Sequence, residues 1–84
     1  MPKMVISALY DARAKVFLRP MASSNELVAI RDVTAEARNP DSMLSRFPDD
    51  FELVFVGEFD SESGAISTYD GNHNPVPIRS VCEE

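Results

Sequence analysis

The groups best suited to catalysis are sparse in this sequence. His73 is its single histidine and Cys82 its single cysteine. Nucleophilic catalysis by a serine or cysteine needs an imidazole beside the nucleophile, whereas His73 stands among turn formers in Gly-Asn-His-Asn-Pro. Adjacent carboxylates such as Asp49 and Asp50 could share a proton, but no neighbouring sequence would desolvate one of them and separate their roles. We therefore expect no catalytic residues and no enzymatic activity.

Metal and cofactor motifs are also weak. The stretch from Asp60 to Gly64 resembles the start of a calcium loop, with Glu62 between them. Its glycine comes one place too early for an EF-hand, and Gly71 stands where that loop places its bidentate glutamate. The sequence has no phosphate-binding glycine loop, no dinucleotide fingerprint and no zinc-ligand spacing. We expect no metal and no cofactor.

The net charge of −6 is distributed unevenly. Residues 1–46 carry seven lysines and arginines against five carboxylates, a balance of +2, whereas residues 47–84 carry one arginine against nine carboxylates, a balance of −8. The overall field therefore repels a nucleic-acid backbone. Contact with DNA would need a local patch, and Arg13, Lys15 and Arg19 are the candidates because alternate spacing can place them on one strand face. A charged edge that simply faces solvent is the alternative.

Aromatic residues are interleaved with these cations. Such interleaving is typical of single-strand binding, because bases stack on aromatic rings while cations contact phosphates. Tyr10 is the candidate stacking residue, and Phe17 is expected in the core.

Hydrophobic periodicity predicts five elements: strands over residues 3–9 and 16–18, a helix over 24–38, and strands over 51–59 and 65–69. Ser23 and Glu26 have the spacing of a capping box at the helix start. The apolar stripe of this helix is predicted to begin at Leu27. A further helical turn is predicted over 41–47, with Asp41 or Ser42 as its cap.

The order of these elements predicts an α+β fold. We expect one domain over residues 1–71, built as a small, mostly antiparallel sheet of about four strands with one long helix on one face. Residues 72–84 lack periodicity, which predicts a loop or loosely ordered tail.

The strand over 51–59 is apolar on both faces. Val54 and Val56 lie on the face opposite its phenylalanines. A single helix covers one face only, so these valines would form an exposed patch of the kind that marks an interface. We predict self-association, as a dimer or a higher oligomer, through this face or through sheet edges. A monomer whose tail folds across the open face is the competing account.

Neither secretion nor a membrane span is expected. The first apolar run contains Ser7 and ends at Asp11, which is too soon for a signal-peptide core. No stretch approaches the roughly 20 apolar residues of a membrane helix. A lone cysteine suits a reducing compartment. We expect a soluble protein that remains in the cytoplasm.

Several segments, in this order and spacing, carry a family resemblance: Leu9-Tyr-Asp-x-x-Ala-x-x-Phe with Pro20, Asn25, Val28-Ala-Ile-Arg31, Asn39-Pro40, Phe47-Pro-Asp-Asp-x-x-Leu53, and Val56-Gly-Glu-Phe-Asp60 with Gly64. Together they resemble the small non-structural protein of gokushovirus-type microviruses, which are single-stranded DNA phages. The resemblance implies a protein that binds DNA or acts in viral DNA replication, in the switch toward single-stranded genome production, in the host cytoplasm.

Two functions stay open at this point. In the first, a self-associating accessory protein binds single-stranded DNA through Arg13, Lys15, Arg19 and Tyr10. In the second, the acidic half of the chain, residues 47–84, binds a replication or capsid-assembly protein without contacting DNA.

Overall fold

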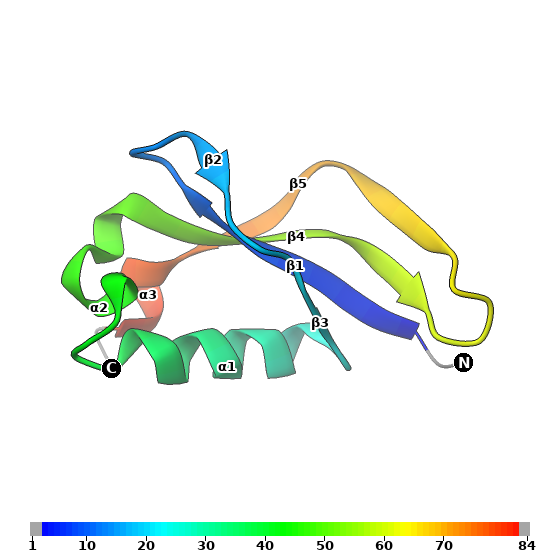
Figure 1. Cartoon of the computed structure of the whole chain (residues 1–84), viewed down its shortest axis with the longest axis horizontal. Helices are drawn as coiled ribbons and strands as arrows, with labels where there is room; N and C mark the ends of the chain where they lie inside the picture. The colour runs from blue at the N-terminus through cyan, green and yellow to red at the C-terminus, as the bar shows by residue number, and fades with distance from the viewer. Residues whose placement is uncertain (1–2, 83–84) are drawn as a thin grey trace.

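The structure, a computed structural model, describes residues 3–82, except for the side chains of residues 70–74 and 82. Its strands are β1 (Lys3–Asp11), β2 (Val16–Phe17), β3 (Met21–Ser23), β4 (Phe51–Asp60) and β5 (Ile66–Pro77). Its helices are α1 (Glu26–Ala37), α2 (Met43–Arg46), the 3₁₀ turn η1 (Pro48–Asp50) and α3 (Ile78–Cys82). The molecule is elongated, with extents of 39 × 23 × 19 Å, and α2 and α3 lie at the same end as the β1–β2 loop (Figure 1).

All strand pairings in the sheet are antiparallel, which confirms the α+β class. The order is β2-β1-β4-β5, and β3 also pairs with β1. The sheet thus has five strands where about four were predicted. The strand that was missed is β3, which begins directly after Pro20. Proline lacks an N–H donor and fixes its own φ, but the residues beyond it are free to pair.

The core lies between α1 and one face of the sheet (Figure 1). Ala29, Val33 and Ala37 form the buried stripe of the helix. They pack against a cluster that includes Phe51, Leu53 and Phe55 of β4. The buried stripe therefore does not begin at Leu27, whose side chain is 77% exposed. Two alanines on the buried face present little bulk where the helix meets the sheet.

The start of α1 differs from the capping box that the sequence predicted. Asn25 is the N-cap, and its Oδ1 accepts a hydrogen bond from the backbone N of Val28 at 2.9 Å. Ser23 is instead the last residue of β3 and is buried. The predicted cap of the short helix α2 is confirmed at Ser42, whose Oγ accepts from the backbone N of Leu44 at 3.1 Å.

The prediction of a loop or loosely ordered tail over residues 72–84 is wrong for residues 72–82. There β5 continues to Pro77 and α3 follows at once. Two register shifts in the pairing of β5 with β4 absorb extra residues, so a strand forms without the alternation that sequence analysis relies on. Ile78 of α3 is 0% exposed and belongs to the core cluster. The prediction of one long helix is also wrong, because the helices are short: α1 has 12 residues and α3, which was not predicted, has five. Residues 83 and 84 lie outside the described residues.

The predicted exposed patch at Val54 and Val56 is also smaller than expected. Val54 is only 2% exposed, and Val56 is half-buried. The strand β4 is interior, with β1 on one side and β5 on the other, so neighbouring residues crowd the small side chain of Val54. Its cross-strand partner Ala8 is likewise buried. Val54 therefore offers little surface to a partner. Within the described chain, no helix is long and apolar enough to cross a membrane.

Candidate functional site

The β1–β2 hairpin holds the predicted nucleic-acid-binding residues. Asp11 builds its loop: the Oδ1 of Asp11 accepts hydrogen bonds from the backbone N of Arg13 at 3.0 Å and of Ala14 at 3.2 Å. Its carbonyl accepts from the N of Lys15 at 2.7 Å. Lys15 has a φ of 60°, in the left-handed region, and this lets the loop turn back into β2. The loop is thus held in shape by local bonds.

The predicted cations do not share one strand face. Arg13 and Lys15 lie in the loop between the two strands, and Arg19 lies in the connection between β2 and β3. Loop residues do not alternate between faces as strand residues do. The guanidinium of Arg13 lies 3.9 Å from a carboxylate oxygen of Asp50 and its side chain is largely exposed, so this ion pair is weak. The hairpin therefore presents two cations at its loop and a third beyond its second strand.

An aromatic pair lies beside these cations. Tyr10 and Phe17 are directly opposite each other in the β1–β2 ladder. Their ring centroids are 4.8 Å apart and their planes are inclined by 51°. Phe17 is half-exposed, so the expectation that it belongs to the core is wrong. A two-residue edge strand cannot bury both faces, and the shortness of the segment before Pro20 was the signal available in the sequence.

The aromatic pair borders a hollow on the face of the sheet opposite α1. Tyr10, Phe17, Glu52 and Val54 line it, and its volume is about 300 Å³. An exposed ring beside a hollow can receive a flat group such as a nucleobase. Glu52 places a carboxylate there, which adds an acceptor for hydrogen bonds and a charge that repels phosphates.

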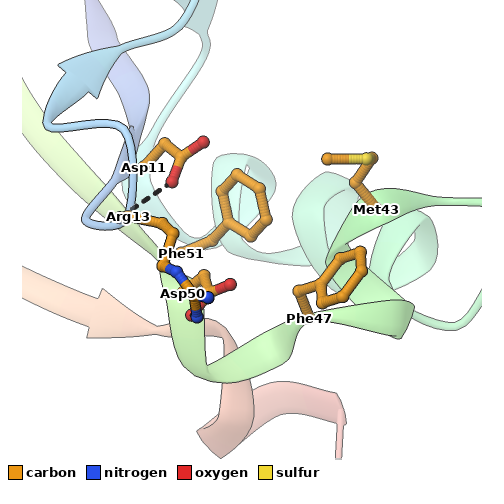
Figure 2. A pocket seen from close by; sticks show the side chains of 6 residues that line it. All are labelled: Asp11, Arg13, Met43, Phe47, Asp50 and Phe51. Carbon is orange, nitrogen blue, oxygen red and sulfur yellow. Dashed lines mark hydrogen bonds and ion pairs between the residues drawn. The ribbon is translucent and has the colours of Figure 1, made fainter.

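Two further hollows lie on the other face of the hairpin, between it and α2. Their volumes are about 260 and 300 Å³, and they share Asp11, Met43 and Phe51. Figure 2 shows the first of them, with Phe51 on one side and Met43 and Phe47 on the other. We call the two together the apolar groove. Its remaining lining residues are Leu9, Arg13, Leu18, Glu36, Ser42, Leu44 and Asp50.

Some carboxylates in the acidic half of the chain, residues 47–84, are compensated by contacts within the same half. Arg79 donates to both oxygens of Asp49 at 2.9 Å. This hydrogen-bonded pairing holds the pKa of Asp49 below its ordinary value. In the β4–β5 loop, the backbone amides of Glu62 and Ser63 donate hydrogen bonds to Asp60, and these bonds hold the pKa of Asp60 below its ordinary value. Among the residues that the structure describes, no group of three or more histidine, cysteine, aspartate or glutamate side chains could hold a metal ion.

These features define a small α+β protein whose most distinctive surface is an exposed aromatic and basic hairpin. The model of the phage ORF5 protein family matches residues 4–83, which is almost the whole chain. The chain therefore belongs to the phage ORF5 protein family. Comparison with curated proteins and with solved structures gives no match. The family match supports the phage origin that the sequence resemblance implied, and it also covers the residues after Gly64, where the segments that carry the resemblance end.

Proposed function

We propose that this phage protein is a non-enzymatic accessory protein of a gokushovirus-type microvirus that binds single-stranded DNA through the β1–β2 hairpin. It would act in the host cytoplasm, in viral DNA replication or in the switch to single-stranded genome synthesis. The observation that carries the proposal is the half-exposed ring of Phe17 packed at a tilt against Tyr10, with Arg13 and Lys15 on the same hairpin. This combination supplies a stacking platform and phosphate contacts together.

The few contacts available on the hairpin predict a modest affinity for single-stranded DNA. Stacking of one base on an aromatic side chain contributes about 1–3 kcal/mol. Each phosphate neutralised on a single strand changes the slope of log K against log salt by about 0.7. Three cations, Arg13, Lys15 and Arg19, therefore predict a slope of about −2. The net charge of −6 opposes this attraction, so binding should be strongest at low salt and should occur through few contacts.

The test is fluorescence anisotropy of a labelled oligothymidylate at several salt concentrations. The double variant Arg13→Ala/Lys15→Ala should flatten the salt slope by about 1.4. The matched control is Arg31→Ala/Arg46→Ala, which removes the same charge from exposed positions outside the hairpin. Phe17→Ala should weaken binding by about tenfold through loss of stacking. Absence of binding at low salt, or an equal effect of both double variants, would exclude the hairpin as a DNA site.

The alternative function is an acidic protein–protein interaction module that binds a viral replication or capsid-assembly protein. The balance of −8 over residues 47–84 favours it. Reversal of Asp49 would be ambiguous, because it would also break the pair with Arg79. Glu62→Lys, in the exposed β4–β5 loop, is the cleaner change. The interaction-module function would be excluded by two results together. Phage replication and capsid proteins would capture the Glu62→Lys variant as well as the parent, and DNA binding would depend on the hairpin.

Self-association is part of the proposal. Because Val54 is buried, a contact between copies would depend on Val56 or on the sheet edge at β5, which pairs with β4 alone in the described sheet. Light scattering of the purified protein, with and without oligothymidylate, gives the mass in both states. A monomer in both would remove self-association from the proposal.

A further inference from the structure

The apolar groove is an uncovered part of the molecular surface. Leu18, Met43 and Phe47 are all large apolar side chains with exposed surface, and Met43 is 58% exposed. They come from two parts of the chain: Leu18 directly follows β2, whereas Met43 begins α2 and Phe47 is its C-cap. The floor is formed by Leu44 and Phe51, which are buried members of the core cluster. Contiguous apolar surface of this kind is typical of an interaction site.

The charge at the margin of the groove is mostly negative. Asp11, Glu36 and Asp50 line it, against the single cation Arg13. Asp11 uses its Oδ1 for the loop amides, and Asp50 lies near Arg13. The exposed carboxylate of Glu36 carries no such contact among the described residues. A cation placed above the apolar floor would therefore meet uncompensated negative charge.

We propose that the apolar groove docks a short segment of another protein in which a large apolar side chain stands next to lysine or arginine. The apolar side chain would cover Met43 and Phe47, and the cation would lie near Glu36. A nucleic acid does not fit, because three carboxylates at the margin repel phosphates. The groove and the aromatic pair of the proposed DNA site lie on opposite sides of the hairpin, because Leu9 and Asp11, which line the groove, alternate with Tyr10 along β1. Arg13, in the loop, borders the groove and also belongs to the proposed DNA site.

The test uses three synthetic amphipathic peptides of equal length: leucine–lysine, leucine–glutamate and serine–lysine. Binding is followed by NMR chemical shifts of the full chain. The leucine–lysine peptide alone should bind and should shift the resonances of Leu18, Met43 and Phe47. Leucine–glutamate tests the charge and serine–lysine tests the apolar anchor.

Variants then locate the site. Met43→Asp should weaken binding of the leucine–lysine peptide by about tenfold or more, and Glu36→Gln by a few fold through loss of one exposed charge. Leu27→Asp is the matched control, because Leu27 is also an exposed apolar residue and lies outside the groove. Unfolding midpoints of the variants establish that each is folded. Equal loss in Leu27→Asp, binding of the serine–lysine peptide, or shifts confined to other surfaces would overturn the proposal. So would a dimer that Met43→Asp dissociates without any peptide binding, since the groove would then be occupied by a second copy.

Discussion

Replacement of Ile78 by alanine tests the largest difference between the sequence-based prediction and the structure. The sequence predicts a loose tail at this position, and in a tail the substitution would change little. In the structure Ile78 is 0% exposed and belongs to the cluster that contains Leu53 and Phe55. Its truncation would leave a cavity beside the sheet.

The expected cost follows from this burial. Truncation of a fully buried isoleucine to alanine lowers the free energy of unfolding by about 2–5 kcal/mol. At about 0.05–0.15 kcal/mol per residue, a chain of 84 residues has a total of only about 4–13 kcal/mol. A change of about 2 kcal/mol would by itself lower the midpoint of thermal unfolding by about 8 °C or more. The milder Ile78→Val should cost about 0.5–1.5 kcal/mol.

Urea denaturation followed by circular dichroism measures these differences. Leu27→Ala is the control, because Leu27 is 77% exposed and its truncation should change the free energy of unfolding by about 0.5 kcal/mol or less. The slope of the free energy against urea should stay the same if both states are unchanged in compactness. If Ile78→Ala and Leu27→Ala cost the same, α3 does not contribute to the core and the reasoning from its burial fails.

Three other changes have effects that the structure sets. Gly57→Ala should lower the free energy of unfolding by about 1–3 kcal/mol, because a Cβ would overlap the carbonyl oxygen of Ser67 and β5 would have to move; an unchanged urea midpoint would contradict this. Asn25→Ala should cost about 1 kcal/mol by removing the cap bond to Val28, whereas Asn25→Asp should retain it. Asp60→Asn should be less stable than the parent at neutral pH. The folded-state pKa of Asp60 lies below 3.8, so its contribution is present above that value and is lost as the pH falls through the folded pKa. The two curves of stability against pH should therefore converge in acid, and parallel curves would refute this.

The fold was predictable where a segment's own residues decide its structure. Alternation identified β1 and β4, and helical spacing with a proline stop located α1 to within two residues at each end. The second half of β5 was not predictable, because its register shifts depend on how the chain fits against β4. The same holds for α3, whose five residues are too short to show periodicity and are ordered by the core they contact.

The sequence predicted which residues belong to the candidate DNA site, but not how the structure arranges them. Tyr10, Arg13 and Lys15 do lie on one hairpin, but the turn that follows Asp11 removes the two cations from the strand faces. A short segment that carries an aspartate is typical of a turn, but sequence spacing does not show that the turn ends at Lys15, a non-glycine residue in the left-handed region. The apolar groove was missed altogether, because its walls come from β1, the end of the hairpin and α2, which are far apart in the sequence.

One consequence of this arrangement is that a single short hairpin serves two surfaces of different chemistry. Strand alternation points Tyr10 and Phe17 to one side and Leu9 and Asp11 to the other, where they line the apolar groove together with Leu18. The amide of Ala12 donates to the carbonyl of Asp50 at 2.8 Å, which ties the loop to the start of β4. A ligand on either side would therefore restrain the same loop, and the two proposed sites can influence each other without a larger change of fold. Because such coupling is reciprocal in free energy, the effect of the leucine–lysine peptide on DNA affinity must equal the effect of DNA on peptide affinity.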